Sequence, residues 1–311
     1  MMNTHQMMLV AGTAAAIIII IGGAIYYSGK DDGDGSDTVK VVATFYPLAY
    51  FSKEIGGEYV DVASLVPYNT EIHSWQPSAM DIVAADKADI LVYNGGGADH
   101  WFERDILPVL GSRERIVVNT TEDMELLTVE YEGHEIVDPH TWICPFTAEQ
   151  QAEKIYRALV KKDGAHEAYY THRWESLREA FEKMDQSYAE GLQNTRKDTI
   201  FVTHTAFGYL AHRYGFAQYG VIGLSADEQP STSTIKKLVD MMIEYDTYVI
   251  YVDPIYSSEY AQTLKNTLEE KTGRDVTILV LYLMLGPVDG MDYFDQQEKN
   301  LENLIQGLEA P

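Results

Sequence analysis

The chain has 311 residues, of which 46% are hydrophobic, and its formal net charge is −25 at pH 7. This length permits two modest domains, and the hydrophobic content argues against wholesale disorder. The negative charge argues against nucleic-acid binding, which needs basic patches. A single cysteine, Cys144, excludes both an intramolecular disulfide and a lipidated N-terminal cysteine.

The first part of the chain is predicted to attach the protein to a membrane. After a short N-terminal segment (1–6), residues 7–27 form a run of 21 residues without a charge, close to the ~20 that cross a bilayer as a helix. We interpret this run as an uncleaved transmembrane anchor. The alternative is a cleaved secretory signal, although AIYYSG lacks the small-x-small pattern of a good cleavage site. Residues 28–37 are acidic and predict a flexible tether.

From Val39 onward, predicted strands alternate with predicted helices, which is typical of an α/β fold with parallel sheets. Residues 44–65 and 203–224 repeat one order: a threonine after a strand, an aromatic-rich helix, a glycine stop and a second strand ending in leucine. The tripeptide Gln-Pro-Ser follows at 76–78 and again at 229–231. This repeat predicts two similar lobes, 38–146 and 197–311, each a mainly parallel sheet flanked by helices.

Residues 147–196 are predicted to form connecting helices. Thr147 and Gln150 make a capping box for a helix that reaches about Lys162. A second helix of about 28 residues starts near His166 and spans roughly 40 Å. Its apolar residues recur at steps of four and three, which places them on one face: they are Tyr170, Trp174, Leu177, Phe181, Met184 and Tyr188. We expect this face to be core laid along both lobes, and the helix to limit how far the lobes swing.

Three histidines stand near the ends of predicted strands. His73 follows VDVASLV through a short loop, His140 lies in IVDPHTW, and His204 ends DTIFVTH. Ligands of open α/β sheets bind outside the carboxyl ends of the strands. In the repeat, His204 aligns with Phe45, which indicates that the second-lobe position was specialised. Three neutral imidazoles suit zinc, with a carboxylate or water completing a tetrahedron.

Three acids are candidates for a part in this site. Glu71, two residues before His73, is the nearest and could be a fourth ligand. Asp138 and Asp253 follow strands and could orient an imidazole by accepting its second N–H. Capping of the next turn is an equally weighted interpretation of these two aspartates.

At these residues the sequence resembles the zinc/manganese solute-binding proteins of ABC importers (TroA-like, cluster A-I). The similarity runs in order from about Val39 to Leu308, through the blocks VVATFYPLAYFSKEIGGEYVDVASLVP, EIHSWQPSAMDI, ADILVYNGGG, DPHTW, FVTHTAFGYLAHRYG and GLSADEQPS. It implies two α/β lobes joined by one long rigid helix, like class III periplasmic binding proteins, with the metal buried between them. It carries the metal-ligand roles to His73, His140 and His204. The third ligand position is His204, and a histidine at this position resembles the zinc-binding branch of the family. A glutamate at this position would resemble the manganese-binding members.

The sequence departs from the family in two places. The zinc branch often has a long histidine-rich loop before the second ligand, whereas YEGHEIVDPH keeps only His134. The family commonly has Asp or Asn-Pro late in the second lobe, where this chain has Tyr282 and Leu283. The fourth ligand therefore has three candidates: Glu71, Asp289 after a register shift, and water.

The resemblance implies a non-enzymatic, extracytoplasmic protein that captures a divalent metal and delivers it to an ABC permease. Zn²⁺ is the expected metal, with Mn²⁺ or Fe²⁺ as alternatives, and a monomer is the expected state. Protonation of the imidazoles is expected to ease release at mildly low pH. A zinc-dependent hydrolase is an alternative, since three histidines with an open position also form a catalytic arrangement. The sequence contains no HExxH motif, which argues against the hydrolase. An adhesin-like surface protein with a structural metal is another.

Overall fold

The computed structural model describes residues 38–131, 134–224 and 231–311. Thr38–Pro311 form one compact unit. The expected segments 1–6, 7–27 and 28–37, and the first two residues of the second Gln-Pro-Ser, lie outside the described residues. Within the described ranges, no helix combines the length and apolar character needed to cross a membrane.

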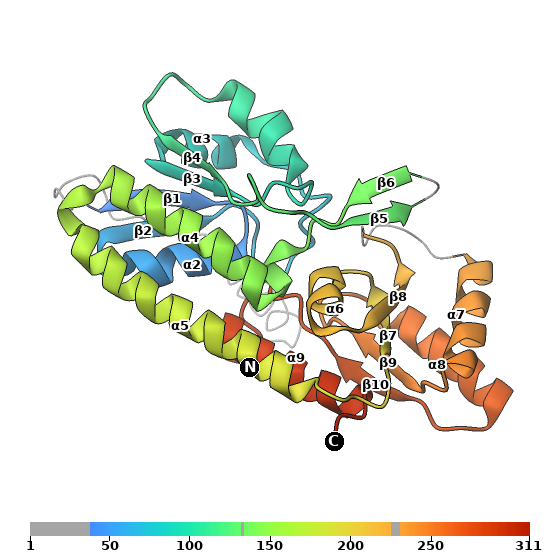
Figure 1. The fold of residues 1–311 in the computed structure, drawn as a ribbon. Coiled ribbons are helices and arrows are strands. Elements are labelled where there is room, and N and C mark those ends of the chain that lie inside the picture. The colour runs from blue at the N-terminus through green and yellow to red at the C-terminus, as the bar shows by residue number, and fades with distance from the viewer. Residues whose placement is uncertain (1–37, 132–133, 225–230) are drawn as a thin grey trace, which may run out of the picture. The chain divides into compact units, whose positions relative to one another are not determined.

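Two four-stranded parallel sheets organise the structure (Figure 1). The strands of the first sheet are β1 (Val39–Ala43), β2 (Val60–Ser64), β3 (Ile90–Tyr93) and β4 (Ile116–Asn119), in the spatial order β2-β1-β3-β4. The strands of the second are β7 (Thr199–His204), β8 (Ala217–Ile222), β9 (Val249–Val252) and β10 (Thr277–Val280), in the order β10-β9-β7-β8. Counted from the first strand of each sheet, both have the order second, first, third, fourth. The predicted duplication is therefore confirmed in the topology.

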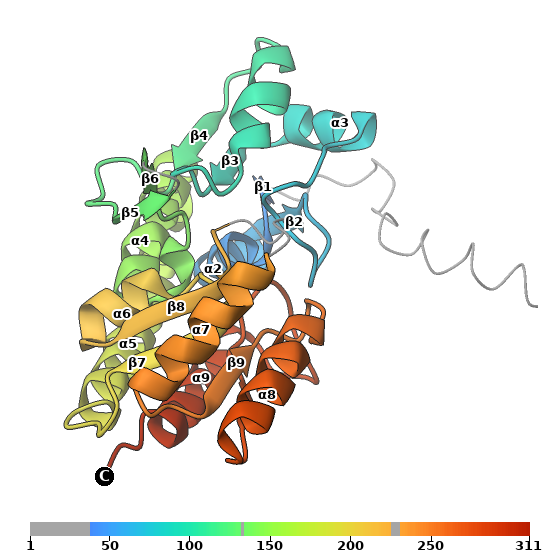
Figure 2. The ribbon, with the colours of Figure 1, turned by 90° about the vertical axis from the view of Figure 1, so that its right-hand side faces the viewer.

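Helices cover these sheets and connect them. They are α2 (Tyr46–Gly56), α3 (Ala79–Lys87), α4 (Pro145–Lys162), α5 (Glu167–Gly191), α6 (Gly208–Tyr214), α7 (Thr232–Glu244), α8 (Glu259–Thr272) and α9 (Tyr293–Gly307). Figure 2 shows α7 and α8 side by side over β8 and β9. We propose the lobe boundaries 38–146 and 197–311, with 147–196 as the connection, because each parallel sheet lies within one of the outer ranges.

The serine of each Gln-Pro-Ser tripeptide has the same structural role in both lobes. Ser78 is the N-cap of α3 and Ser231 is the N-cap of α7. The Ser231 hydroxyl accepts the Thr234 N–H at 3.1 Å, while the Ser78 N–H donates to the Asp81 carboxylate at 2.7 Å. At the start of α7 the bond satisfies the backbone N–H of Thr234, and at the start of α3 it satisfies the backbone N–H of Ser78. The repeat seen in the sequence thus marks two equivalent helix starts.

A hairpin of β5 (Thr128–Tyr131) and β6 (His134–Val137), which the sequence analysis did not predict, lies in the first lobe. It occupies the position of the histidine-rich loop expected from the family resemblance, and it ends directly before Asp138. The Asp138 N–H donates to the Leu127 carbonyl at 2.8 Å, which closes the base of the hairpin.

The start of α4 was predicted incorrectly. The helix begins at Pro145, in the first turn where proline is tolerated, rather than at a cap on Thr147. The Thr147 hydroxyl donates to the Cys144 carbonyl at 3.1 Å, so it does not cap the helix as an acceptor. The predicted end at Lys162 is confirmed.

The apolar face of α5 is confirmed at every predicted position. Tyr170, Trp174, Leu177, Phe181, Met184 and Tyr188 are its buried residues. The helix has 25 residues, fewer than expected, because it begins at Glu167 and ends at Gly191. In Figure 1, α5 passes α2 of the first lobe and reaches α9, which packs on the second sheet.

Phe181 packs between elements that belong to different lobes. Its ring lies 5.4 Å from the Phe51 ring of α2 and 5.0 Å from the Phe294 ring of α9, measured between centroids. A single core residue therefore contributes to holding the two lobes on one helix.

Phe181→Ala should lower the free energy of unfolding by about 3–5 kcal/mol, because it removes a buried aromatic ring and leaves a cavity. Denaturant unfolding of the metal-free protein measures this loss. Glu179→Ala, at an exposed position of the same helix, is the control and should change stability by less than about 0.5 kcal/mol. Equal effects of the two substitutions would contradict a shared core along α5.

Candidate metal centre

His73 lies in the loop between β2 and α3, and contacts from both lobes fix this loop. The Trp101 indole N–H donates to the carbonyl of Ile72 at 2.8 Å. On the other side, the Asn69 N–H donates to Leu285 O at 2.8 Å, and the Asn69 amide donates to Pro287 O at 2.9 Å. A Cβ on Gly286 would lie 2.8 Å from the Asn69 nitrogen, so this close approach of two backbones requires glycine.

His140 follows the hairpin and is fully buried. Its Nδ1 lies 2.8 Å from Asp138 Oδ1, and its backbone N–H donates to the same oxygen at 3.0 Å. The Asn94 amide, at the end of β3, donates to Pro139 O at 3.1 Å. Tyr209 of α6 donates to Asp138 O at 2.9 Å. Groups from both lobes therefore hold the short segment 138–140.

His204 is the last residue of β7 and is buried. Its Nε2 lies 3.1 Å from Leu224 O, and its Nδ1 is buried without a hydrogen-bond partner among the described residues. In the first lobe, α2 starts directly after Phe45, whereas α6 starts four residues after His204. The intervening turn is held by the Phe207 N–H, which donates to Gln218 Oε1 at 3.0 Å.

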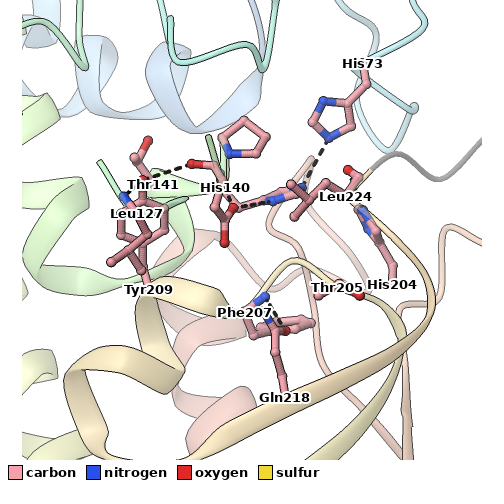
Figure 3. A network of polar contacts seen from close by, with 12 residues as sticks. His73, Leu127, His140, Thr141, His204, Thr205, Phe207, Tyr209, Gln218 and Leu224 are labelled. Atoms are coloured by element: carbon pink, nitrogen blue, oxygen red, sulfur yellow. Dashed lines mark hydrogen bonds and ion pairs between the residues drawn. The ribbon is translucent and has the colours of Figure 1, made fainter. Parts of the chain in front are cut away.

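The three imidazoles converge on one point (Figure 3). One ring nitrogen from each of His73, His140 and His204 lies within 4.8 Å of the others. The Nε2 atoms of His73 and His140 are 3.2 Å apart. Two nitrogens bound to one tetrahedral Zn²⁺ at about 2.0–2.1 Å lie about 3.3–3.4 Å apart. The spacing therefore suits two ligands of a single ion.

Hydrogen bonding at His73 also fits a cation. The ring faces the backbone of Ala98, where its hydrogen bond favours the protonated ring, and it faces Nε2 of His140. Asp138 holds the proton of His140 on Nδ1, so the His140 Nε2 presents a lone pair. A neutral imidazole has one N–H and cannot donate to both neighbours. A metal ion between the two Nε2 atoms would remove this conflict, because both nitrogens would then present lone pairs.

All three histidines have lowered pKa values. Burial, with the neighbouring His140, lowers the pKa of His73 to about 4. Burial holds the pKa of His140 well below its usual value and also lowers that of His204. The rings are therefore neutral at pH 7 and ready to bind a metal. The expected release at mildly low pH stays a prediction, and the lowered pKa values move protonation of the metal-free ligands toward more acidic conditions.

Of the two residues among the candidate fourth ligands, Glu71 contacts the backbone of His73, whereas Asp289 lies in an exposed turn. Glu71 Oε1 accepts the His73 N–H at 2.7 Å, and its Oε2 accepts the hydroxyl of Tyr256 from the second lobe. Asp289 is exposed in a tight turn, with a positive φ of 51°. Neither residue belongs to the group of convergent ligand atoms found in the described part of the chain.

Asp138 and Asp253 have different roles. Asp138 orients an imidazole, and burial raises its pKa to about 7. A nearby cation would oppose this shift by favouring the carboxylate. Asp253 instead caps a turn: its oxygens accept the N–H groups of Ile255 at 2.8 Å and Leu283 at 2.6 Å. The turn-capping interpretation thus fits Asp253, and the imidazole-orienting one fits Asp138.

Sequence reasoning missed the residues that support the site from a distance. Tyr256, Tyr209 and Asn94 each contact a group far along the chain. Asn94 and Tyr209 lie within sequence blocks that resemble the family, but nothing in those blocks indicated their contacts. The only signal was position, since Tyr256 and Asn94 closely follow the ends of β9 and β3.

A cavity of about 510 Å³ opens next to the site, with His73, Trp75, His100, Arg104, Pro139 and Leu224 among its lining residues.

This fold and this site define a two-lobed α/β metal-binding protein in which three histidines from separate segments meet between the lobes. Residues 41–307 match the family model described as zinc-uptake complex component A, periplasmic. The chain belongs to this family, whose described role is metal uptake rather than catalysis.

Named relatives agree with this assignment. The chain is 32% identical over 292 residues to the high-affinity zinc uptake system protein ZnuA of Bacillus subtilis, covering 90% of each sequence. It is 29% identical to the zinc-binding lipoprotein AdcA of Streptococcus pneumoniae, but covers 57% of that longer protein. The crystal structure of the Zn(II)-bound ZnuA-like domain of S. pneumoniae AdcA aligns with a TM-score of 0.74 and 29% identity, covering 87% of this chain and 99% of that domain.

Asp138→Asn should weaken zinc binding by about 10–100-fold. The substitution removes a carboxylate that orients the His140 ring and makes that ring more basic. Competition with a zinc chelator measures the affinity. Asp163→Asn is the matched control, since Asp163 accepts from Nδ1 of His166 at 2.7 Å on the α4–α5 connection, away from the site. A comparable loss of affinity in both variants would contradict a specific role for Asp138.

Lowering the pH should destabilise the metal-free protein through His73. The folded state keeps this ring neutral down to a pKa of about 4, whereas the unfolded chain protonates it near pH 6.5. The unfolded state binds more protons between these values, so stability falls as the pH decreases. Relative to His73→Gln, which cannot titrate, the wild type should lose about 1–2 kcal/mol of unfolding free energy between pH 7 and pH 5. Parallel losses in both proteins would refute this assignment.

Proposed function

We propose that this protein captures Zn²⁺ outside the cytoplasmic membrane and delivers it to an ABC permease. The observation that carries this proposal is the convergence of three imidazole nitrogens within 4.8 Å. His73, His140 and His204 are the proposed ligands, and each comes from a different loop or strand end. Membership of the zinc-uptake family supports the same role.

The ligand set favours zinc over manganese. Three nitrogen ligands suit Zn²⁺, whereas Mn²⁺ prefers carboxylate, carbonyl and water oxygens. Among the described residues, the carboxylate of Glu71 is engaged by the His73 N–H and by Tyr256. We therefore propose water, rather than Glu71 or Asp289, as the fourth ligand.

Attachment to the membrane would keep the protein near its permease. We propose that residues 7–27 provide this attachment and that 28–37 act as a tether, in line with the description of the family as periplasmic. We propose a monomer, because one chain supplies all three histidines.

The other functions receive less support. A hydrolase needs a general base near the metal. Two carboxylates beside the histidines in the described part of the chain are already engaged: Asp138 by His140, and Glu71 by His73 and Tyr256. A purely structural metal is not needed to join the lobes, because α5 packs against α2 and α9 away from the histidines. Reversible binding by a protein that stays folded without metal therefore fits best.

Incubation of the purified protein with equal Zn²⁺ and Mn²⁺ should give about one zinc and little manganese per chain, because the proposed ligands are nitrogens. Elemental mass spectrometry after desalting measures both metals. His204→Ala should weaken zinc binding by at least about 100-fold, which corresponds to about 2.7 kcal/mol. The control is His172→Ala, an exposed histidine of α5 that should leave binding unchanged.

A preference for manganese would point to oxygen ligands not placed in this site, and would reject the zinc assignment. The absence of any bound metal would reject the carrier function. Unfolding of the wild type on chelation would favour the structural-metal alternative.

A further inference from the structure

Tyr256 connects the two lobes beside the metal centre. It lies in the segment between β9 and α8 of the second lobe. Its ring meets the ring of His204 edge to face, with 5.5 Å between centroids and an interplanar angle of 84°. Its hydroxyl donates to Oε2 of Glu71, which belongs to the first-lobe loop that carries His73. One side chain thus touches a proposed ligand of the second lobe and reaches toward one of the first.

Glu71 transmits this contact to His73. Its second oxygen, Oε1, accepts the backbone N–H of His73 at 2.7 Å. Both oxygens of the carboxylate are therefore used for hydrogen bonds, one to each lobe. A hydrogen bond to an ionised acceptor is stronger than one between neutral groups. Two hydrogen bonds thus connect Tyr256 through Glu71 to the backbone of His73.

Hydrogen bonds to Asp253 hold the turn after β9 that carries Tyr256. The Asp253 side chain accepts the Ile255 N–H at 2.8 Å, and its carbonyl accepts the Tyr256 N–H at 3.2 Å. Its other carboxylate oxygen accepts the Leu283 N–H at 2.6 Å. The turn after β9 is therefore fixed at both ends, and the tyrosine that it carries has a defined direction.

The other end of the His73 loop is already fastened to the second lobe. Asn69 donates from its backbone to Leu285 O and from its side chain to Pro287 O. Between Asn69 and His73, the hydrogen bond from Tyr256 to Glu71 is a second attachment to that lobe. When it opens, the segment of Glu71 and His73 loses this attachment to the second lobe, while Asn69 still attaches the start of the loop and Trp101 still holds Ile72.

We propose that Tyr256 is a positioning residue that acts as a latch on zinc release, by holding the Glu71–His73 segment against the second lobe. This inference rests on the proposed function as a zinc carrier. Opening of the latch moves one ligand segment and leaves the α5 core intact. Zinc release then needs a loop movement, not a large hinge movement of the lobes.

Tyr256→Phe tests the latch, because it removes the hydroxyl and keeps the ring against His204. The full chain is loaded with Zn²⁺, mixed with excess chelator in a stopped-flow instrument, and compared with wild type. Release should be about tenfold faster, which is the effect of losing one hydrogen bond to a charged group. The association rate should change by less than about twofold, since the ligands themselves are unaltered.

Glu71→Gln and the double variant test the same connection independently. If the two residues act through one hydrogen bond, the double variant should release zinc no faster than the faster single variant. Additive effects would show separate roles and overturn the latch. Tyr260→Phe is the matched control, because Tyr260 lines a cavity between α7 and α8 away from the histidines, and its release rate should equal that of wild type.

Equal release rates for wild type and Tyr256→Phe, with zinc bound normally by both, would overturn the latch and leave the carrier function intact. Failure of the wild type to bind zinc in the same experiment would reject the carrier function itself. If Tyr256→Phe does not fold, an unchanged release rate in Glu71→Gln is sufficient to refute the proposal.

Discussion

The proposed sharing of one ion by the three histidines depends on the packing of α5, which helps to hold the two sheets in a fixed relation. Phe181 contacts α2 on one side and α9 on the other, and the buried residues of α5 continue this contact in both directions. Protein cores are close-packed and resist continuous deformation. The distance between His73 in one lobe and His204 in the other is thereby set by a core that contains no metal ligand.

Polar contacts set the positions of the ligand rings within this frame. The hydroxyl of Tyr209 accepts the Leu127 N–H at 3.1 Å and donates to Asp138 O, so α6 of the second lobe supports the segment that carries His140. Asp138 in turn fixes the ring and its tautomer. Such support holds the ligands in place before the metal arrives, which reduces the ordering that binding must produce.

In the proposed zinc carrier, the packed core and the loop of His73 have separate roles. The lobes supply a constant framework, whereas the loop of His73 makes its contacts through individual hydrogen bonds at Asn69 and Glu71. Hydrogen bonds at a partly exposed loop open at lower free energy than a packed core. Tight binding of zinc is therefore compatible with its release if only the loop of His73 has to move, as proposed above. Burial lowers the pKa of all three imidazoles, which favours the neutral, metal-binding form of each ring near neutral pH.

The sequence by itself determined the features that depend on local pattern: the α/β alternation, the repeated lobe, the apolar face of α5 and the three histidines near strand ends. These follow from side-chain periodicity, helix caps and the common edge at which parallel strands end. Tertiary structure alone decided the partners of the acids. Glu71 meets Tyr256, 185 residues away, while Asp253 caps a turn and Asp138 orients His140. Asp289 lies at an exposed turn instead. The distant donors, Tyr256 for Glu71 and Leu283 for Asp253, depend on how remote loops pack, and no local spacing encodes them.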